Sequence, residues 1–440
     1  MNPEAIHMVI LVTIILFAIA LSIFIRHEKK KHAVVSEKVK EAKECGTYEP
    51  ISLHPYIDPN KCIGSGACVK ACHEKDVIGL SNGKGRLINA SMCVGHGACA
   101  LACPVGAITL VFGTAKRGVE IPYVDPYFET NVKGIYIAGE LGGMGLIRNS
   151  LVQGIQAMNN MAESLKDAGA ASAGVYDVLV VGAGPAGIGA TLKAMEKKLN
   201  YLFIDQDEFG GTVANFPVRK IVMTAPVELP LYGKVQFRET TKETIMELWN
   251  KIKQDTGLKI NTKEKLTGVE TLPDGFKVKT AGGEYTTRKL LLCLGRRGTP
   301  RKLGVPGESM PKVSYRLIDP AQHKNEKVIV VGGGDSAVEA AMAIAAEGNE
   351  VILSYRKDTF GRIKAGNKTR LDEAVKKGSV KLVLNSNVTE ILPKEAKLDV
   401  AGAIETVPND YIYVFAGGEL PNAFLKSIGL KIETHYGMPS

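Results

Sequence analysis

Two short cysteine-rich runs are the part of this sequence best able to do chemistry. Of the eight cysteines in 440 residues, six lie between residues 62 and 103. The runs read CIGSGACVKAC at 62–72 and CVGHGACALACP at 93–104, so one repeats the other with His96 in place of Ser65. Thiols at short, fixed spacings in a chain of otherwise intracellular composition indicate metal ligands rather than disulfides.

Both runs resemble the C-x2-C-x2-C-x3-C motif of dicluster bacterial ferredoxins, with the second cysteine replaced. In that family a small glycine-rich loop wraps each cluster, and the fourth cysteine of each run reaches the other cluster. The resemblance therefore implies two iron–sulfur clusters, [4Fe-4S] or [3Fe-4S]. It assigns Cys62, Cys68 and Cys103, with Ser65, to one site, and Cys93, Cys99 and Cys72, with His96, to the other. A zinc site is the alternative.

The two substituted positions allow two interpretations. Either Ser65 and His96 ligate iron directly, or they border a three-iron cluster or an open corner of a cluster. Imidazole is a known iron–sulfur ligand, which favours ligation by His96, whereas the two interpretations are balanced for Ser65. A neutral imidazole in place of a thiolate makes a cluster less negative and therefore easier to reduce.

A glycine-rich motif follows the cysteine runs. Residues 176–187, YDVLVVGAGPAG, lead an apolar strand into G-x-G-x-x-G at Gly182, Gly184 and Gly187, and a helical stretch follows. The next predicted strand ends at Asp205, at about the spacing of a ribose-binding carboxylate. Because glycines let the backbone approach a pyrophosphate at a helix N-terminus, the segment predicts a dinucleotide-binding fold.

A second copy of the motif lies at 327–337, KVIVVGGGDSA, and its candidate binding residues are Gly332, Gly334, Asp335 and Ser336. The strand that follows ends in Arg356 and Lys357, with no carboxylate. Basic side chains there suit the 2′-phosphate of NADPH, which a carboxylate would repel. The alternative is that both are solvated residues at a strand end.

Two such folds in tandem resemble the thioredoxin reductase-like flavoproteins over residues 176–440. This resemblance implies FAD in the first fold and NADP, or NAD, in the second. Gly295 lies in a segment that looks like the strand returning from the first domain, and 413–422 looks like its partner after the second. Residues 210–217, GGTVANFP, are similar to bacillithiol-disulfide-reductase-like members, which implies further cofactor contacts at Gly211, Thr212 and Asn215.

One segment of the family pattern is expected in an unusual place. These flavoproteins end in a Gly-Asp pair and a helix that bind FAD, whereas here a similar segment precedes the first glycine motif. It carries Gly139 and Glu140, with Glu in place of Asp, and then a helix at about 146–165. We therefore predict a circular permutation with a flexible joint at 166–175. The alternative, a separate domain at 113–165, is short for an independent core.

The N-terminus predicts a membrane anchor. Residues 6–25 are almost wholly apolar, and about 20 residues span the ~30 Å hydrocarbon layer. The formal net charge is +9, and a basic run at 26–31 follows the apolar stretch, which indicates a membrane surface rather than nucleic acid. The basic run predicts a cytoplasmic catalytic body and a single pass through a bacterial-type inner membrane. A cleaved signal peptide or a buried core helix are the alternatives.

Together these features predict an α/β protein with two Rossmann-like domains, a small α+β ferredoxin-like domain and one N-terminal transmembrane helix. The expected parts are an anchor at 1–27, a basic linker at 28–57, a ferredoxin-like domain at 58–112, the permuted FAD-binding segment at 113–165, a linker at 166–175, the FAD-binding domain at 176–308, the NAD(P)-binding domain at 309–415 and a return segment at 416–440.

The thiol content of the flavoprotein part decides the expected chemistry. Thioredoxin reductases use a C-x-x-C disulfide, but between 104 and 440 the sequence has only Cys293, in an apolar strand. Nicotinamide gives two electrons as a hydride, clusters take one at a time, and flavin can do both. We therefore expect an NAD(P)H-dependent oxidoreductase in which catalysis is mostly positioning, with no acid–base residue.

The expected partners follow from the anchor. Electrons would pass, in either direction, between the clusters and a redox partner protein or a quinone at the membrane, and the enzyme is a possible homodimer. Two alternatives stay open: an NADPH-dependent reductase of low-molecular-weight disulfides, and a redox-sensing membrane protein.

Overall fold

The computed structural model divides the chain into two compact units, 1–118 with 435–440, and 119–434. It describes residues 3–44, 48–50, 53–72, 74, 76–93, 95, 97–115, 118–143, 145–166, 169, 171–218, 220–224, 226–237, 239–296, 298–360, 363 and 365–438. Of the predicted site residues, His96 lies outside these ranges, so its predicted role stays a prediction.

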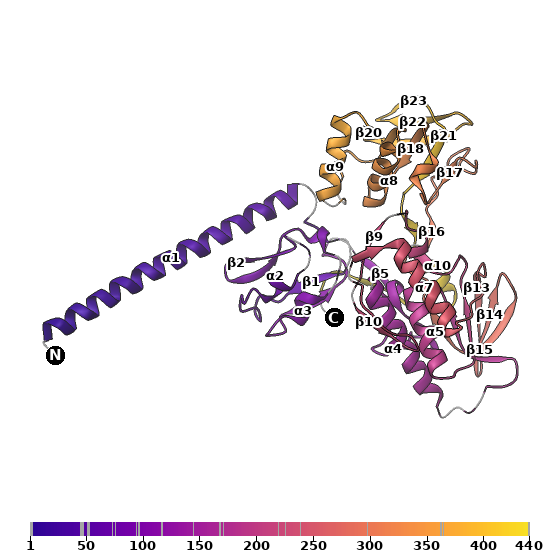
Figure 1. Ribbon diagram of the computed structural model, residues 1–440, viewed down its shortest axis with the longest axis horizontal. Helices are drawn as coiled ribbons and strands as arrows, with labels where there is room; N and C mark the ends of the chain where they lie inside the picture. The colour runs from indigo at the N-terminus through magenta and orange to yellow at the C-terminus, as the bar shows by residue number, and fades with distance from the viewer. Residues whose placement is uncertain are drawn as a thin grey trace. The chain divides into compact units, whose positions relative to one another are not determined.

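The first unit begins with one long helix, α1 (Pro3–Glu44) (Figure 1). Among the described residues it is the one helix long and apolar enough to cross a membrane, a test of length and composition that an N-terminal signal sequence also passes. The basic linker predicted at 28–57 is helical as far as Glu44. Its residues before that point are mostly Lys, Glu, Ala and Val with no Gly or Pro, so nothing ends the helix earlier.

The C-terminal third of α1 packs against the rest of its unit. Val39 and Ala42 are buried, and His32 and Val35 lie on the same face at helical spacing. The His32 Nδ1 atom lies 2.7 Å from the Ser81 hydroxyl oxygen. The apolar part of α1, by contrast, is exposed along its length.

The rest of the first unit is a small α+β domain that pairs two short antiparallel ribbons with two short helices. Its elements are β1 (His54–Ile57), α2 (Ala67–Ala71), β2 (Ile78–Ser81), β3 (Lys84–Leu87), η1 (Ala90–Met92), α3 (Ala98–Leu101) and β4 (Ile108–Val111). Strand β1 pairs with β4, and β2 pairs with β3. The core contains Val77, Ile78 and Ile108 together with two of the cysteines, Cys68 and Cys99.

The second unit contains a sheet of order β13-β14-β15-β7-β8, in which β15, β7 and β8 are parallel. The strands of this sheet are β7 (Val175–Val181), β8 (Tyr201–Ile204), β13 (Leu266–Leu272), β14 (Gly275–Thr280) and β15 (Glu284–Leu292). The helices and short strands around it are α5 (Pro185–Glu196), α6 (Gly211–Ala214), β9 (Ile221–Met223), β10 (Val227–Leu229), β11 (Gly233–Val235), β12 (Glu239–Thr241) and α7 (Lys242–Thr256).

A segment that precedes this fold in the sequence completes its sheet. The elements of the segment are β5 (Val119–Pro122), β6 (Ile135–Ile137), η2 (Gly139–Gly142) and α4 (Ile147–Leu165). Strand β6 lies parallel to β15, with Ile135 opposite Leu290. Helix α4 packs so closely on α5 that a Cβ atom at Gly154 would lie 2.0 Å from the carbonyl oxygen of Ala186. The sheet therefore draws strands from both sides of the predicted joint.

The second Rossmann-like domain has a parallel sheet of order β17-β24-β18-β19-β20. Its strands are β17 (Val313–Ser314), β18 (Lys327–Val331), β19 (Glu350–Ser354), β20 (Val380–Val383) and β24 (Tyr411–Val414), and its helices are η3 (Pro320–Gln322), α8 (Asp335–Ala346) and α9 (Ala365–Lys376). An antiparallel meander follows in β21 (Ser386–Ile391), β22 (Glu395–Val400) and β23 (Ala403–Pro408). After β24 the chain forms β25 (Gly418–Glu419), which pairs with β16 (Thr299–Pro300) from before β17, then α10 (Asn422–Ser427) and β26 (Ile432–His435), which pairs with β5.

Candidate functional site

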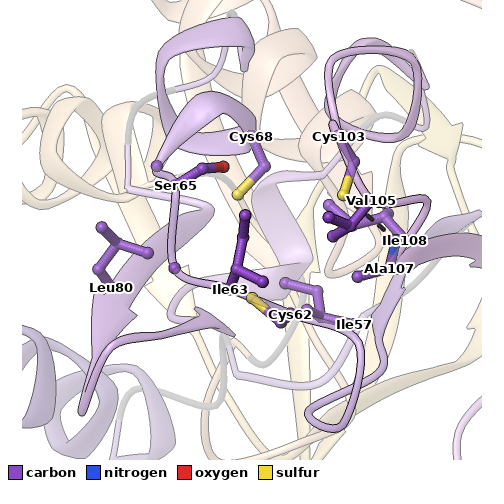
Figure 2. Close-up of a pocket in the computed structure, with 12 residues that line it drawn as sticks. Ile57, Cys62, Ile63, Ser65, Cys68, Leu80, Cys103, Val105, Ala107 and Ile108 are labelled. Atoms are coloured by element: carbon purple, nitrogen blue, oxygen red, sulfur yellow. Dashed lines mark hydrogen bonds between the residues drawn. The ribbon is translucent and has the colours of Figure 1, made fainter.

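The first unit contains a cavity lined by Cys62, Ser65, Cys68 and Cys103 (Figure 2). Three of these residues come from the first cysteine run, whereas Cys103 is the last cysteine of the second run. Apolar side chains of Ile57, Leu80 and Ile108 complete the walls. The cavity thus gathers the four residues that the ferredoxin resemblance assigns to one site.

A second cavity has the complementary set of cysteines. It is lined by Cys72 from the first run and by Cys93 and Cys99 from the second, with Glu74 beside them. Within the described ranges, no three His, Cys, Asp or Glu side chains are grouped so as to hold a single metal ion. Thiols placed around a cavity suit an iron–sulfur cluster rather than a single metal ion, because the ligands of a cluster bind it at successive corners.

Glycines shape the two cysteine loops. Gly64, Gly66, Gly95 and Gly97 all have φ between 72° and 78°, a left-handed conformation that other residues rarely adopt. Backbone N–H groups then reach the sulfurs, since Gly85 N–H donates to Cys62 Sγ (3.3 Å) and Ala107 N–H donates to Cys103 Sγ (3.2 Å). Such N–H···S bonds stabilise thiolates and tune the potential of a cluster.

Each cavity contains thiols whose pKa is raised by burial. Burial, together with the nearby sulfurs of Cys93 and Cys72, raises the pKa of the Cys99 thiol to about 11. Burial also raises the pKa of Cys68, and the Cys62 and Cys103 sulfurs add to it. Because metal ligation requires thiolates, a positively charged iron core would supply the missing stabilisation, and the donor set fits one.

The first glycine motif forms an open loop before α5. A Cβ atom at Gly182 would lie 2.4 Å from the Cys293 carbonyl oxygen, and one at Gly187 would lie 1.9 Å from the Gly182 carbonyl oxygen. A Cβ atom at Gly184 would meet no atom within 4 Å. Two glycines are thus required by close packing, and the third faces free space at a helix N-terminus, where a pyrophosphate would fit.

Asp205 lies directly beside this loop and is buried. Its carboxylate accepts hydrogen bonds from the N–H groups of Ala183 and Asp207. Burial raises the pKa of Asp205, and these two bonds oppose that shift. The carboxylate therefore stands where the ribose contact is predicted, and it already holds the second residue of the glycine loop.

The other predicted FAD contacts surround the same loop. A Cβ atom at Gly211 would lie 2.7 Å from the Cα atom of Gly184, so α6, which also carries Thr212, begins against the loop. Asn215 donates to the Gly211 carbonyl oxygen (3.1 Å) and accepts a bond from Arg316 (2.8 Å). The structure thus brings α6 together with the first glycine motif.

The predicted permuted segment reaches this region as well. A Cβ atom at Gly139 would lie 2.8 Å from the Ala186 Cβ atom, and one at Gly295 would lie 3.9 Å from Glu140 Oε2. Gln153, which the sequence did not single out, accepts a hydrogen bond from the Gly139 N–H group (2.9 Å). No local pattern marks Gln153, because it lies about two turns inside helix α4.

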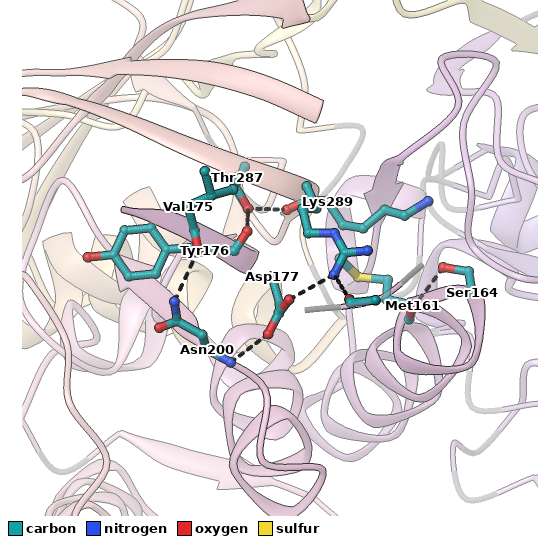
Figure 3. A network of polar contacts seen from close by, with 10 residues as sticks. Met161, Ser164, Val175, Tyr176, Asp177, Asn200, Thr287 and Lys289 are labelled. Atoms are coloured by element: carbon teal, nitrogen blue, oxygen red, sulfur yellow. Dashed lines mark hydrogen bonds and ion pairs between the residues drawn. The ribbon is translucent and has the colours of Figure 1, made fainter. Parts of the chain in front are cut away.

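Polar contacts connect the predicted joint between α4 and β7 to the neighbouring strands (Figure 3). The Arg288 guanidinium group donates to the Asp177 carboxylate (3.1 Å) and to the Gly169 carbonyl oxygen (2.9 Å). Asp177 also accepts from the Asn200 N–H group (2.9 Å), and the Thr287 hydroxyl donates to the Tyr176 carbonyl oxygen (3.3 Å). These contacts link the joint to the start of β7 and to β15.

The second glycine motif has the same geometry as the first. A Cβ atom at Gly332 would lie 2.6 Å from the Phe415 carbonyl oxygen, whereas one at Gly334 would meet no atom within 4 Å. Helix α8 then begins with Asp335, whose carboxylate accepts a bond from Asn367 (2.7 Å), and with the exposed Ser336. A second phosphate-sized space therefore lies at the start of α8.

Two basic residues follow the end of the next strand, β19. Arg356 and Lys357 come after Tyr355 and are exposed. The Tyr355 ring packs on the backbone of Gly333 and stacks on Phe360, with ring centroids 5.1 Å apart. No sequence pattern marks Tyr355, whose ring holds the residue after β19 against the glycine loop.

Two family models match separate parts of the chain. Residues 179–439 match the family described as pyridine nucleotide-disulphide oxidoreductase. The chain belongs to this family. Residues 54–104 match the 4Fe-4S dicluster domain. The protein is therefore an FAD-dependent NAD(P)H oxidoreductase with an iron–sulfur domain.

Individual relatives of this oxidoreductase cover its flavoprotein part. A ferredoxin–NADP reductase of Ignicoccus hospitalis is 30% identical over 58% of this chain and 82% of its own length. A bacilliredoxin reductase of Bacillus subtilis is 24% identical over 59% of this chain and 82% of its own length. The solved bacillithiol disulfide reductase of Staphylococcus aureus has a TM-score of 0.52 at 24% identity, covering 59% of this chain and 81% of that one, and this likeness shows the fold alone.

The oxidoreductase lacks a thiol pair in its described flavoprotein unit. Cys293 is buried at the end of the sheet, where its N–H group donates to the Val181 carbonyl oxygen (2.7 Å). Burial raises the pKa of the Cys293 thiol, which keeps it neutral. A neutral, buried thiol has little nucleophilicity, so Cys293 is suited to packing rather than to redox exchange.

Proposed function

We propose that this oxidoreductase passes electrons between NADPH, FAD and two iron–sulfur clusters within one chain, and exchanges them with a redox partner protein or a quinone at a membrane. The observation that carries the proposal is the sorting of six cysteines from two runs into two cavities, each containing a cysteine of the other run. This crossed arrangement matches two-cluster ferredoxins, in which the fourth cysteine of each run ligates the other cluster.

The residues that would hold the cofactors fall into three groups. FAD would be held by Gly182, Gly184, Gly187, Asp205, Gly211, Thr212, Asn215, Gly295, Gly139 and Glu140. NADPH would be held by Gly332, Gly334, Asp335, Ser336, Arg356 and Lys357. The clusters would be held by the seven residues Cys62, Ser65, Cys68, Cys72, Cys93, Cys99 and Cys103, with His96 as a proposed eighth. Bound flavin converts a two-electron hydride into single electrons, which clusters can carry. For a quinone acceptor the overall reaction is NADPH + H⁺ + quinone → NADP⁺ + quinol.

Two further proposals concern organisation. We infer that residues 113–165 contain a circularly permuted part of the FAD fold, supported by the pairing of β6 with β15 and the packing of α4 on α5. We also propose that α1 anchors the protein in a bacterial-type inner membrane with its catalytic body in the cytoplasm, supported by its apolar stretch and the basic residues that follow.

A second candidate is reduction of low-molecular-weight disulfides directly at the flavin. The likeness of 210–217 and of the flavoprotein fold to bacilliredoxin and bacillithiol disulfide reductases favours it. The fused cysteine-rich module gives no reason for such an activity, because a disulfide accepts two electrons and needs no one-electron carrier.

Steady-state kinetics with matched acceptors separate the two candidates. Reconstituted full-length protein would be supplied with NADPH and either a one-electron dye or bacillithiol disulfide. The proposal predicts rapid dye reduction that depends on iron content and little NADPH consumption with the disulfide. Rapid disulfide reduction together with dye reduction that is independent of iron would contradict it.

A further inference from the structure

Helix α1 sets the order of the two cluster sites relative to the apolar stretch. Three contacts run in sequence along its packed face. His32 lies against Ser81 (2.7 Å), a Cβ atom at Gly79 would lie 3.0 Å from the Val35 side chain, and Lys38 forms an ion pair with Asp76 (2.6 Å). As α1 leads away from its apolar part, its contacts therefore run backwards along the chain, from Ser81 at the end of β2 to Asp76 before its start.

The first of these contacts lies on the side of the first cavity. Ser81 leads through the β2–β3 turn into β3, where Lys84 donates to the Cys62 carbonyl oxygen (2.6 Å) and Gly85 N–H donates to Cys62 Sγ (3.3 Å). The same turn packs against Gly64, where a Cβ atom would lie 2.1 Å from the Gly83 carbonyl oxygen. The contact nearest the apolar stretch thus supports the loop of the first cavity.

The last contact lies on the side of the second cavity. Asp76 is followed by Val77, which lines that cavity with Glu74 and Cys72. From Ile25, the end of the apolar stretch, a helix rises about 10 Å to His32 and about 20 Å to Lys38, at about 1.5 Å per residue. The second cavity is therefore supported about 9 Å further along the helix than the first.

The two cavities also differ in what surrounds them. Ile63 and Val105 line the first cavity and are exposed, Ile63 with 65% of its surface accessible. The described lining of the second cavity includes the acidic Glu74 and no exposed large hydrophobic side chain. Apolar side chains at the mouth of the first cavity suit contact with lipid or with a lipid-soluble acceptor.

We propose that the site of Cys62, Ser65, Cys68 and Cys103 is the membrane-proximal cluster site and the exit to a membrane-bound acceptor, while the site of Cys72, Cys93 and Cys99 is distal. The inference rests on the proposed anchor and clusters. The electrons that leave from this site are those that NADPH donates in the reaction given under the proposed function. A rigid helix with three fixed contacts, rather than a flexible tether, holds the two sites in this order.

Spin relaxation in vesicles tests the order without using turnover. The full chain would be placed in phosphatidylethanolamine–phosphatidylglycerol vesicles containing a Gd(III)-chelating lipid, and the clusters would be reduced with dithionite. C99A keeps the first site and C68A keeps the second. We expect severalfold stronger relaxation enhancement in C99A than in C68A. Equal enhancement, or the reverse order, would overturn the proposal.

A helix insertion provides a second variant should either alanine protein lose both clusters. Seven residues, EAAAKEA, placed after Lys29 add about two turns and about 10 Å, so the packed face from His32 to Ala42 keeps its phase. The insertion should weaken relaxation of the wild-type clusters severalfold; unchanged relaxation would contradict the rigid stalk. If dithionite but not NADPH reduces the clusters, the proposed function fails while the relaxation data still decide the order.

Discussion

The cysteines of the two units lie in different environments. In the first unit, six cysteines surround two cavities, four of them partly exposed. In the second, Cys293 is the one free cysteine among the described residues, and it is buried without a second thiol nearby. A chain of a disulphide oxidoreductase family thus carries its thiols in a fused metal-binding module. In the proposed function, the family fold takes up the hydride and the fused module passes the electrons on.

The largest effect should follow from emptying both cavities. The C68A/C99A double variant removes one thiol from each, and we expect NADPH-dependent dye reduction to fall more than a hundredfold. Flavin reduction by NADPH should stay within about twofold, since the glycine loops are untouched. Dye reduction that survives in iron-free protein would show that electrons leave from the flavin directly.

The first glycine motif of the second unit allows a test that separates the loss of space for FAD from strain within the protein. A methyl group at Gly184 would meet no protein atom, so G184A should fold normally yet bind FAD at least tenfold more weakly, about 1.4 kcal/mol. G187A is the matched contrast, because its methyl group would lie 1.9 Å from the Gly182 carbonyl oxygen and should lower the unfolding free energy by about 2 kcal/mol. Calorimetric FAD titration and thermal unfolding measure both, and unchanged FAD affinity in G184A would refute the assigned pyrophosphate site.

A smaller effect is expected at the basic end of β19. Removing two exposed charges in R356A/K357A should raise the KM for NADPH about tenfold, since charge-assisted bonds to phosphate contribute about 1.5–3 kcal/mol. The KM for NADH should barely change, which makes NADH the internal control. Equal losses with both nucleotides would indicate that these residues do not read the 2′-phosphate.

The smallest effect is expected at the buried thiol. C293A removes the one described thiol of the flavoprotein unit, and NADPH-dependent dye reduction should stay within about twofold, with a stability loss of about 1 kcal/mol. Turnover at matched FAD content checks this. A tenfold loss would mean that Cys293 takes part in electron transfer and that the contrast between the units is false.

The sequence was most informative where chemistry depends on local spacing. Spacing within each cysteine run is a local property and marked the ligand candidates, whereas the resemblance to dicluster ferredoxins implied that Cys72 and Cys103 belong to the opposite cavities. The long extension of α1 to Glu44 was not predicted, since a basic stretch beside an apolar one reads equally as a linker. Gln153 and Tyr355 were also missed, because their partners, Gly139 and Gly333, lie in other elements that only the fold brings close.

Asp205 shows the same limit in another way. Its spacing from the glycine motif indicated a ribose contact, yet its carboxylate already accepts two backbone hydrogen bonds, from Ala183 and Asp207. A side chain can keep its place in a motif while serving the loop itself, and spacing alone does not distinguish these roles.

Anaerobic stopped-flow mixing of the reconstituted protein with NADPH tests the central claim most directly. Flavin and cluster absorbance would be followed separately, with the C68A/C99A variant as the reference for flavin alone. Electron transfer within the chain predicts flavin bleaching followed by loss of cluster absorbance in the wild type. Flavin bleaching with cluster absorbance left unchanged would contradict it.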